Sequence, residues 1–440
     1  MSAQICRTMR SVCCHTIKNR SFLHKAVLLH VAPSDLCAPW APACHKRLYS
    51  LDSLFSGPGR PTLGTSSQQA CAEKTSASSS PRNLSTVAVH DQHPPLSRYD
   101  FLDLGETEEK IRHAKSCKHK RYLIVDPDLA TLVTEHLRPK DDKTIIFECN
   151  PGPGVLTRTL LNNGAQRVIA LEGEKLFLHG LKDLERQLDG QLEVVHCNFF
   201  RLDPLGCGLF KPPTRFSESL FTDLGISERT WTDDIPGKVF GILPPHNERG
   251  LLLKMVYSLF EQQSFYKYGR LELNLFISEK ECLKLLSQPG DMVKYRAFSV
   301  LWQMACDISL LHKEPRQSIV MSSSRAKQRA VDNFCLVRLR PRADLFSTGL
   351  TPSNATALLV MVKQCLVKKK SKLIDKLNLW CPDRGSELLS EMGMREDILT
   401  GHVFPDEYLR LFLLMDKSED FRQSWLYREN LENTGRMGWT

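Results

Sequence analysis

Two glycines and one acidic residue have the types and spacing of a nucleoside-binding site. Gly152 and Gly154 lie in the stretch ECNPGPGVLT, directly after a short apolar run, and Glu172 ends the next apolar run. In an α/β sheet, a glycine turn after a strand lets the backbone approach a ligand and exposes free N–H groups of the next helix. A carboxylate at the end of the following strand can accept hydrogen bonds from both hydroxyls of a ribose. The three residues therefore predict a nucleoside cofactor.

The spacing also decides between cofactors. A dinucleotide fingerprint needs a third glycine, and Thr157 stands at its position, which disfavours nicotinamide and flavin cofactors. The turn also lacks the Gly-Lys-Ser/Thr of a Walker loop. S-Adenosyl-L-methionine is the cofactor that uses the remaining arrangement. The alternative interpretation is an ordinary strand-to-helix turn with Glu172 on the surface.

Alternating strands and helices must position these residues. Apolar and β-branched runs predict buried strands at 143–149, 167–172, 192–197, 238–243 and 271–277. Helical periodicity between them predicts helices at 155–163, 176–188 and 251–262. This alternation is typical of βαβ units in a parallel sheet. We therefore expect an α/β fold.

The second half of the chain changes character. Two more predicted strands, 303–311 and 333–340, flank a polar loop and indicate a closing hairpin. From Thr351 onward the pattern predicts only helices, at 355–366, 372–379, 386–392, 407–415 and 421–431. We expect an α/β domain over residues 99–342 and a smaller helical domain over 343–440. The last helix mixes acids with aromatic residues, and we expect it to dock on its own domain, with a partner protein as the alternative.

The N-terminal region has a different composition. Residues 1–50 carry seven lysines and arginines against one acid, Asp35, with serines and apolar residues between them, which is typical of a mitochondrial transit peptide. A basic tail without a targeting role is the alternative. Residues 51–98 are rich in Ser, Pro and Gly without apolar periodicity, and we interpret them as a disordered linker. The longest apolar stretch, 26–32, is far shorter than a membrane span requires, so we expect no membrane insertion.

Composition excludes several kinds of site. The 15 cysteines are scattered without CxxC spacing or an adjacent histidine cluster, so we expect mostly buried thiols and no metal site. The formal net charge of +9 on 440 residues favours polyanionic partners only mildly. The distribution of the charges must therefore decide whether the chain binds nucleic acid.

Three motifs resemble one enzyme family. ECNPGPGVLT, ALEGE at 170–174 and HCNFFRLD at 196–203 are similar, in order and spacing, to the first three motifs of the rRNA adenine N6-dimethyltransferases. The similarity covers residues 121–431 and is strongest to mitochondrial members. It implies a Rossmann-like class I methyltransferase sheet, a smaller C-terminal helical domain and S-adenosyl-L-methionine as cofactor. By the same resemblance the cofactor pocket comprises Ile124 (or Leu123, one register away), Gly152, Gly154, Glu172 and Asn198.

Two positions depart from the family pattern in this pocket. Asn150 replaces the first glycine of the first motif, where the turn can require a positive φ that asparagine tolerates better than most residues. Asn198 replaces the aspartate that accepts from the cofactor adenine, and a neutral acceptor is roughly half as strong as an ionised one. We expect cofactor binding to be weakened rather than lost.

The fourth motif departs further. The family has N-L-P-Y or N-L-P-F, whose Asn and Pro oxygens accept from the target amine while the aromatic ring stacks on the flipped base. This chain has Ile242, Leu243, Pro244 and Pro245 instead. Ile242 cannot accept a hydrogen bond and Pro245 is a poor stacking surface. We therefore assign no catalytic residue and expect methyl transfer to be residual or lost, with a working rRNA dimethyltransferase as the alternative.

Basic residues gather between Lys313 and Arg342 in the predicted hairpin. We assign Arg325, Lys327 and Arg329, at its loop, to nucleic-acid binding, with a solvated surface loop as the alternative. The resemblance to mitochondrial members implies a transcription initiation factor in the mitochondrial matrix nucleoid. Its implied partners are mitochondrial RNA polymerase, promoter DNA, mitochondrial transcription factor A and mitochondrial small-subunit rRNA. A general RNA-binding chaperone is a further alternative.

Overall fold

The computed structural model describes residues 121–139, 144–204, 210–244, 247–321 and 333–427. The predicted transit peptide (1–50) and linker (51–98) lie outside the described residues. So do the loop with Arg325, Lys327 and Arg329, and Pro245 of the fourth motif. The chain divides into two units, Met1–Val87 and Ala88–Thr440, and every described residue belongs to the second.

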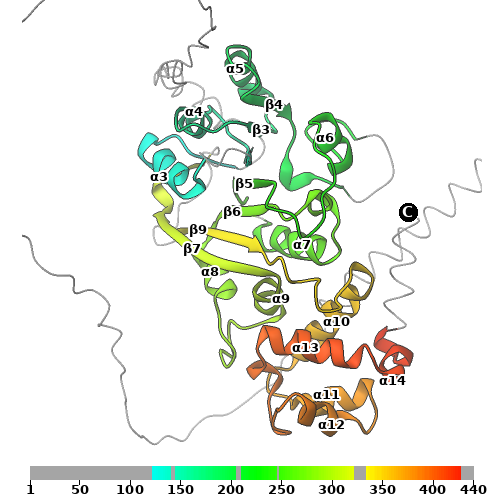
Figure 1. Cartoon of the computed structure of the whole chain (residues 1–440). Helices are drawn as coiled ribbons and strands as arrows, with labels where there is room; N and C mark the ends of the chain where they lie inside the picture. The colour runs from blue at the N-terminus through cyan, green and yellow to red at the C-terminus, as the bar shows by residue number, and fades with distance from the viewer. Residues whose placement is uncertain (1–120, 140–143, 205–209, 245–246, 322–332, 428–440) are drawn as a thin grey trace, which may run out of the picture. The chain divides into compact units, whose positions relative to one another are not determined.

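Seven strands form one mixed sheet (Figure 1). Its order is β4-β3-β2-β5-β6-β9-β7. The strands from β4 to β6 pair in parallel, whereas β9 is antiparallel to both β6 and β7. Their bounds are β2 (Ile145–Cys149), β3 (Val168–Glu172), β4 (Leu192–His196), β5 (Gly237–Ile242), β6 (Glu272–Ser278), β7 (Cys306–Pro315) and β9 (Asn333–Pro341). The five predicted parallel strands and the closing hairpin β7–β9 are confirmed.

The strand order reverses at β2, which lies between β3 and β5. The chain proceeds from β2 outward to β3 and β4, and returns to the other side of β2 for β5 and β6. In open α/β sheets the crevice at such a reversal, beyond the carboxyl ends of the strands, is where ligands bind. The glycine turn after β2 and the fourth motif at the end of β5 therefore lie side by side.

Two buried clusters cover the two faces of the sheet. Along β2 and β3 the side chains alternate between them: Ile146 packs in one cluster and Phe147 in the other. The Ile146 cluster includes helices α3 (Pro127–Leu137), α4 (Val155–Asn162) and α5 (Lys175–Arg186). The Phe147 cluster includes α6 (Ser217–Asp223), α7 (Glu248–Phe260) and the apolar face of α9 (Ala297–Ala305). Such two-sided burial explains why the central strands are apolar at nearly every position.

One predicted strand boundary is wrong. We predicted a strand at 303–311, but Gln303 to Ala305 complete helix α9 and β7 begins at Cys306. Helix α9 is buried on nearly all sides, including Trp302 at 0% exposed. Residues 297–305 are mostly apolar, and a short apolar run does not by itself separate a buried helix from a buried strand.

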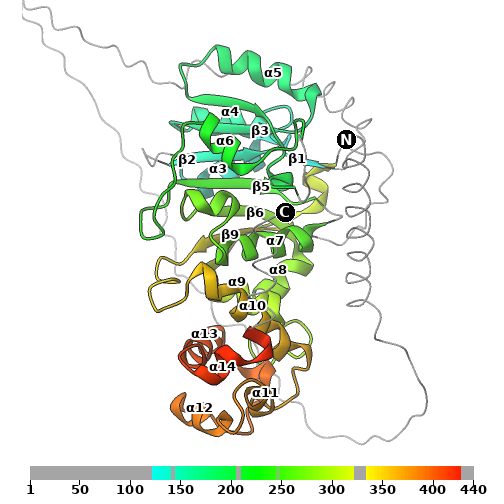
Figure 2. The ribbon, with the colours of Figure 1, turned by 90° about the vertical axis from the view of Figure 1, so that its right-hand side faces the viewer.

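The C-terminal region is helical, as predicted. It contains α10 (Pro352–Val367), α11 (Leu373–Trp380), α12 (Gly385–Glu391), α13 (Pro405–Met415) and α14 (Glu419–Gln423). Figures 1 and 2 both show these helices gathered at the opposite end of the described chain from α5. The arrangement is that of a Rossmann-like class I methyltransferase sheet followed by C-terminal helices.

The last predicted helix is interrupted. We predicted 421–431; α14 ends at Gln423, Ser424 has an extended backbone, and helix resumes over 425–427, where the described residues end. Phe421 and Leu426 are nevertheless fully buried, and the Phe421 ring packs 6.0 Å from that of Phe412 on α13. The described part of this segment therefore docks on its own domain.

Three further observations concern the described residues only. Their cysteines are buried thiols without a disulfide bond. No group of three or more His, Cys, Asp or Glu side chains among them could hold a metal ion. Within the same ranges, no helix combines the length and the apolar character needed to cross a membrane.

Candidate functional site

The glycine turn after β2 adopts the strained backbone that its sequence suggests. Asn150, Gly152 and Gly154 have φ values of 56°, 62° and 80°, in the left-handed region. The expected positive φ at Asn150 is confirmed. Gly152 also needs to lack a side chain, because a Cβ there would lie 2.7 Å from Leu123 Cδ2. The turn leads directly into the N-terminus of α4, which Gly154 caps without a side-chain hydrogen bond, and the first N–H groups of a helix have no acceptor within it.

Leu123 and Ile124 reach this turn from the N-terminal side. The two-residue strand β1 (Tyr122–Leu123) pairs with β8 (Val320–Met321) and places the Leu123 side chain against Gly152. Both Leu123 and Ile124 are buried, at 1% and 5% exposed. Of the two registers that the sequence left open, the contact with the glycine turn is made by Leu123.

Glu172 lies at the end of β3, beside the turn, and is fully buried. Its Oε2 accepts from the Gly152 N–H at 2.9 Å, and its Oε1 accepts from the Glu174 N–H at 2.6 Å. Oε1 also accepts from Nη1 of Arg121 at 2.5 Å. The surface position that was the alternative for Glu172 is therefore wrong. The carboxylate that the sequence assigns to ribose binding already has internal donors on both oxygens.

The two asparagines lie close to Glu172 from neighbouring strand ends. Asn198 caps a short 3₁₀ turn, where its Oδ1 accepts from the Phe200 N–H at 3.1 Å. Asn150 Oδ1 is buried and has no hydrogen-bond partner. A Cβ built on Gly173 would lie 3.5 Å from Asn150 Oδ1 and 3.4 Å from Asn198 Cβ. The structure thus brings Gly152, Glu172 and Asn198 together, as the sequence predicted.

A second buried carboxylate, which was not predicted from the sequence, joins β2 to α4 on either side of the turn. Glu148 lies within β2 at 2% exposed and accepts from the Thr157 hydroxyl of α4 at 2.6 Å. The pKa of Glu148 is raised from 4.5 to about 8, mainly because the side chain is buried. The hydrogen bond from Thr157 lowers this pKa, and the nearby charge of Glu172 raises it. At neutral pH Glu148 is therefore mostly protonated. In the sequence, the feature that could have indicated this buried site is a single acidic residue within an apolar strand.

This pKa predicts a pH-dependent stability. Because the folded pKa of Glu148 is raised, its protonated form stabilises the fold fully below pH 4.5, and this contribution is lost as the pH rises towards about 8. In the unaltered chain, the free energy of unfolding should fall by up to about 1.4 kcal/mol per pH unit over this range, the slope for one proton. We expect Glu148→Gln, which can still accept from Thr157, to make this fall less steep. Urea denaturation between pH 5 and pH 8 (about the titration range) measures this. The exposed Glu396→Gln is the control, and an equal flattening in both variants would contradict the assignment.

The fourth motif ends β5 with aliphatic side chains. Ile242 is 9% exposed and belongs to the Ile146 cluster, whereas Leu243 is 1% exposed and belongs to the Phe147 cluster. Gly241 has no room for a side chain, since a Cβ there would lie 2.8 Å from Phe200 Cζ. The first, third and fourth motifs therefore converge at this edge of the sheet, and an apolar side chain stands where the family pattern has Asn.

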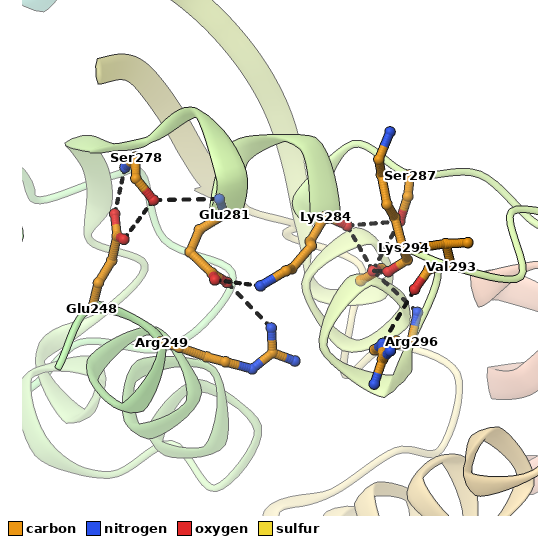
Figure 3. Close-up of polar contacts among 10 residues, drawn as sticks. Glu248, Arg249, Ser278, Glu281, Lys284, Ser287, Val293, Lys294 and Arg296 are labelled. Carbon is orange, nitrogen blue, oxygen red and sulfur yellow. Dashed lines mark hydrogen bonds and ion pairs between the residues drawn. The ribbon is translucent and has the colours of Figure 1, made fainter. Parts of the chain in front are cut away.

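A polar network fixes the helix that follows this motif (Figure 3). Glu248, in the first turn of α7, accepts from the N–H and the hydroxyl of Ser278 at the end of β6. Arg249 Nη1 lies 3.2 Å from Glu281 Oε2, and Glu281 also pairs with Lys284. These contacts join α7 to α8 (Glu279–Leu285) and hold the start of α7 at the carboxyl edge of the sheet.

The described basic residues of the hairpin are held by internal partners. Each contacts a carboxylate or an aromatic ring of this chain: Lys313 pairs with Glu279, Arg316 lies over the Tyr122 and Phe334 rings, Arg338 and Arg340 pair with Glu272, and Arg342 pairs with Asp344 and Asp406. The basic concentration that the sequence shows is therefore partly structural. Arg325, Lys327 and Arg329, the residues assigned to nucleic acid, lie outside the described ranges.

The residues at this site fit S-adenosyl-L-methionine only in part. The turn, the start of α4 and the unpartnered Asn150 oxygen match a nucleoside site. Glu172 does not, because its oxygens are taken by Arg121 and by two backbone N–H groups and it has no exposed surface. In this arrangement the oxygens of Glu172 are not available to the hydroxyls of a ribose.

Comparisons with known proteins agree with the motifs. The family described as ribosomal RNA adenine dimethylase, a family of S-adenosylmethionine-dependent methyltransferases, matches residues 113–417. Dimethyladenosine transferase 2, mitochondrial, from Bos taurus is 40% identical over 350 residues, which covers 76% of this chain and 88% of the relative. The Homo sapiens protein of the same name is 39% identical over 330 residues, covering 72% and 83%. The chain therefore belongs to the ribosomal RNA adenine dimethylase family.

Proposed function

We propose that this chain is a mitochondrial transcription initiation factor that binds mitochondrial RNA polymerase and assists promoter melting, with residual or lost methyltransferase activity. The observation that carries the proposal is Ile242, a buried aliphatic side chain at the position where the family pattern has the Asn acceptor. The fold supplies a nucleic-acid-binding scaffold, and the group that would activate an adenine amine is absent from this position.

Energetics support the loss of chemistry. An unmet hydrogen bond at the reacting amine costs about 1–3 kcal/mol, and a missing aromatic platform costs about 1–3 kcal/mol per base. An increase of about 1.4 kcal/mol in the activation free energy slows a reaction tenfold. The changes at Ile242 and Pro245 together therefore slow methyl transfer by roughly one to four orders of magnitude.

The proposed setting follows the relatives, which are named as mitochondrial proteins. We place the chain in the mitochondrial matrix nucleoid, with residues 1–50 as transit peptide, 51–98 as linker, 99–342 as α/β domain and 343–440 as helical domain. Its partners are mitochondrial RNA polymerase, promoter DNA and mitochondrial transcription factor A. Its affinity for S-adenosyl-L-methionine is weak.

A working mitochondrial small-subunit rRNA adenine N6-dimethyltransferase is the second candidate. The preserved positive φ values of the glycine turn favour it, since this turn serves a cofactor in the family pattern. This candidate requires that Pro244 and the strand backbone alone suffice to orient the target amine.

Reconstituted initiation tests the first candidate. Mitochondrial RNA polymerase is assayed with and without this chain, on a linear promoter and on the same promoter with a pre-melted start site. We expect the chain to be required on the linear template and dispensable on the pre-melted one. Equal transcription without the chain on both templates, together with methylation of a small-subunit rRNA hairpin by the unaltered protein at the rate of an active family member, would establish the second candidate instead.

The hairpin loop gives a separate prediction. Replacing Arg325, Lys327 and Arg329 with Gln is expected to weaken promoter binding and to reduce the slope of log affinity against log salt by about 2–3, since each lost phosphate contact removes about 0.7–0.9. The matched control is Arg338→Gln with Arg340→Gln in the same hairpin, because both arginines pair with Glu272. Filter binding from low to moderate salt measures both. An unchanged slope in the loop variant would contradict the assignment.

A further inference from the structure

Arg121 lies where the sugar of a nucleoside cofactor would meet this site. We propose that Arg121 acts as an internal stand-in for that sugar, so that it sets the affinity of the chain for S-adenosyl-L-methionine and closes the ribose end of the pocket in the free protein. The inference concerns the cofactor site alone, and it stands or falls separately from the role in transcription.

The hydrogen bonds of Glu172 carry the first step. A carboxylate offers about four lone-pair positions on two oxygens. Three are taken here: Arg121 Nη1 at 2.5 Å and the Glu174 N–H at 2.6 Å on Oε1, and the Gly152 N–H at 2.9 Å on Oε2. Glu172 is also 0% exposed. Two ribose hydroxyls cannot bind both oxygens while Arg121 stays in place.

The position of the guanidinium carries the second step. Its other nitrogen, Nη2, lies 3.3 Å from Glu174 Oε1, and 3.2 Å from the point that a Cβ on Gly173 would occupy. Asn150 Oδ1 and Asn198 Cβ lie within 3.5 Å of the same point. Arg121 therefore lies among residues from the ends of three neighbouring strands, the group that would surround the nucleoside.

The chain before β1 carries the third step. Arg121 is directly followed by Tyr122 and Leu123 of β1, and the Leu123 side chain covers Gly152. One short segment thus covers the glycine turn with an apolar side chain and the acid with a cation. The Arg121 contact must open before a ribose binds both oxygens of Glu172, and its opening loosens β1 because Arg121 directly precedes this strand.

The net contribution of one hydrogen bond to a charged group changes an equilibrium constant, here that of cofactor binding, by roughly ten- to hundredfold. The test is Arg121→Gln, whose amide can still donate a neutral hydrogen bond to Glu172. The matched control is Arg167→Gln, which also removes an Arg–Glu pair from β3 and its neighbour: Arg167 lies 2.6 Å from Glu193, both about one third exposed. Arg167 precedes β3, at the end of the strand opposite to Glu172.

Isothermal titration calorimetry with S-adenosyl-L-methionine, and separately with S-adenosylhomocysteine, measures the affinity of each full-length protein. We expect Arg121→Gln to bind both at least tenfold more tightly (roughly, from one charged hydrogen bond) than the unaltered chain and Arg167→Gln. Equal or weaker binding by a folded Arg121→Gln variant overturns the proposal.

A second measurement uses the unaltered protein, in case the variant does not fold. Amide hydrogen exchange of residues 121–126 is compared without ligand and with millimolar S-adenosyl-L-methionine. We expect exchange in this segment to become faster with ligand, because the cofactor displaces Arg121 and releases β1. Slower or unchanged exchange in this segment at a ligand concentration that protects residues 150–157 overturns the proposal.

Discussion

Glu172→Ala is expected to lower the free energy of unfolding by about 3–5 kcal/mol, the typical cost of removing one partner of a buried ion pair. Arg121 is 8% exposed, and its Nη1 would lose the Glu172 acceptor at 2.5 Å, while Nη2 would keep only the longer contact to Glu174. The Gly152 and Glu174 N–H groups would lose their acceptor as well. Equilibrium denaturation in urea at neutral pH measures the change.

Glu174→Ala is the matched control for this prediction. Glu174 contacts the same guanidinium, but at 3.3 Å and with a side chain that is 23% exposed. Partly solvated ion pairs contribute about 0–1 kcal/mol, so we expect a correspondingly small loss. If Glu172→Ala lowered the free energy of unfolding no more than Glu174→Ala, the Arg121–Glu172 pair would not be the contact that holds β1 against the glycine turn.

The central sheet was predictable because its strands are buried on both faces. Each of the five parallel strands is a short apolar run next to a glycine or polar break, and each lies within one or two residues of its predicted bounds. Their carboxyl ends meet at one edge, which is why Gly152 and Glu172 could be grouped from their positions after strands, whereas Asn198 was added by the family resemblance. The site residues that follow strands are the ones that periodicity can locate.

Arg121 could not be predicted in the same way. It lies in a run of lysines and arginines whose composition indicates a solvated surface, and only the tertiary fold brings it to Glu172, 51 residues later. Helix α8 was also missed, although Ser278 and Glu281 form the S-x-x-E signal of a helix start, and Ser278 does cap it. Long-range pairing and buried helices leave little trace in local sequence, whereas caps do.

Ile242→Asn combined with Pro245→Phe is expected to raise the kcat of methyl transfer about 30-fold or more, because an acceptor and a stacking ring each contribute about 1–3 kcal/mol. Arg121→Gln in the same protein is expected to lower the KM for S-adenosyl-L-methionine and to leave kcat unchanged. Methylation of a small-subunit rRNA hairpin, measured across cofactor concentrations for all combinations, separates the two effects.

The residue next to Ile242 provides a control for this cycle. Ile242 packs in the Ile146 cluster, whereas the adjacent Leu243 packs on the opposite face of the sheet, so Leu243→Asn is the matched control and is expected to destabilise without raising kcat. An equal rise in both would mean that a looser strand end, not a restored acceptor, limits the reaction. No rise in either, with the cofactor bound, would mean that the fourth motif is not what limits methyl transfer. In both cases Ile242 would no longer support the proposal that methyl transfer by this chain is residual or lost.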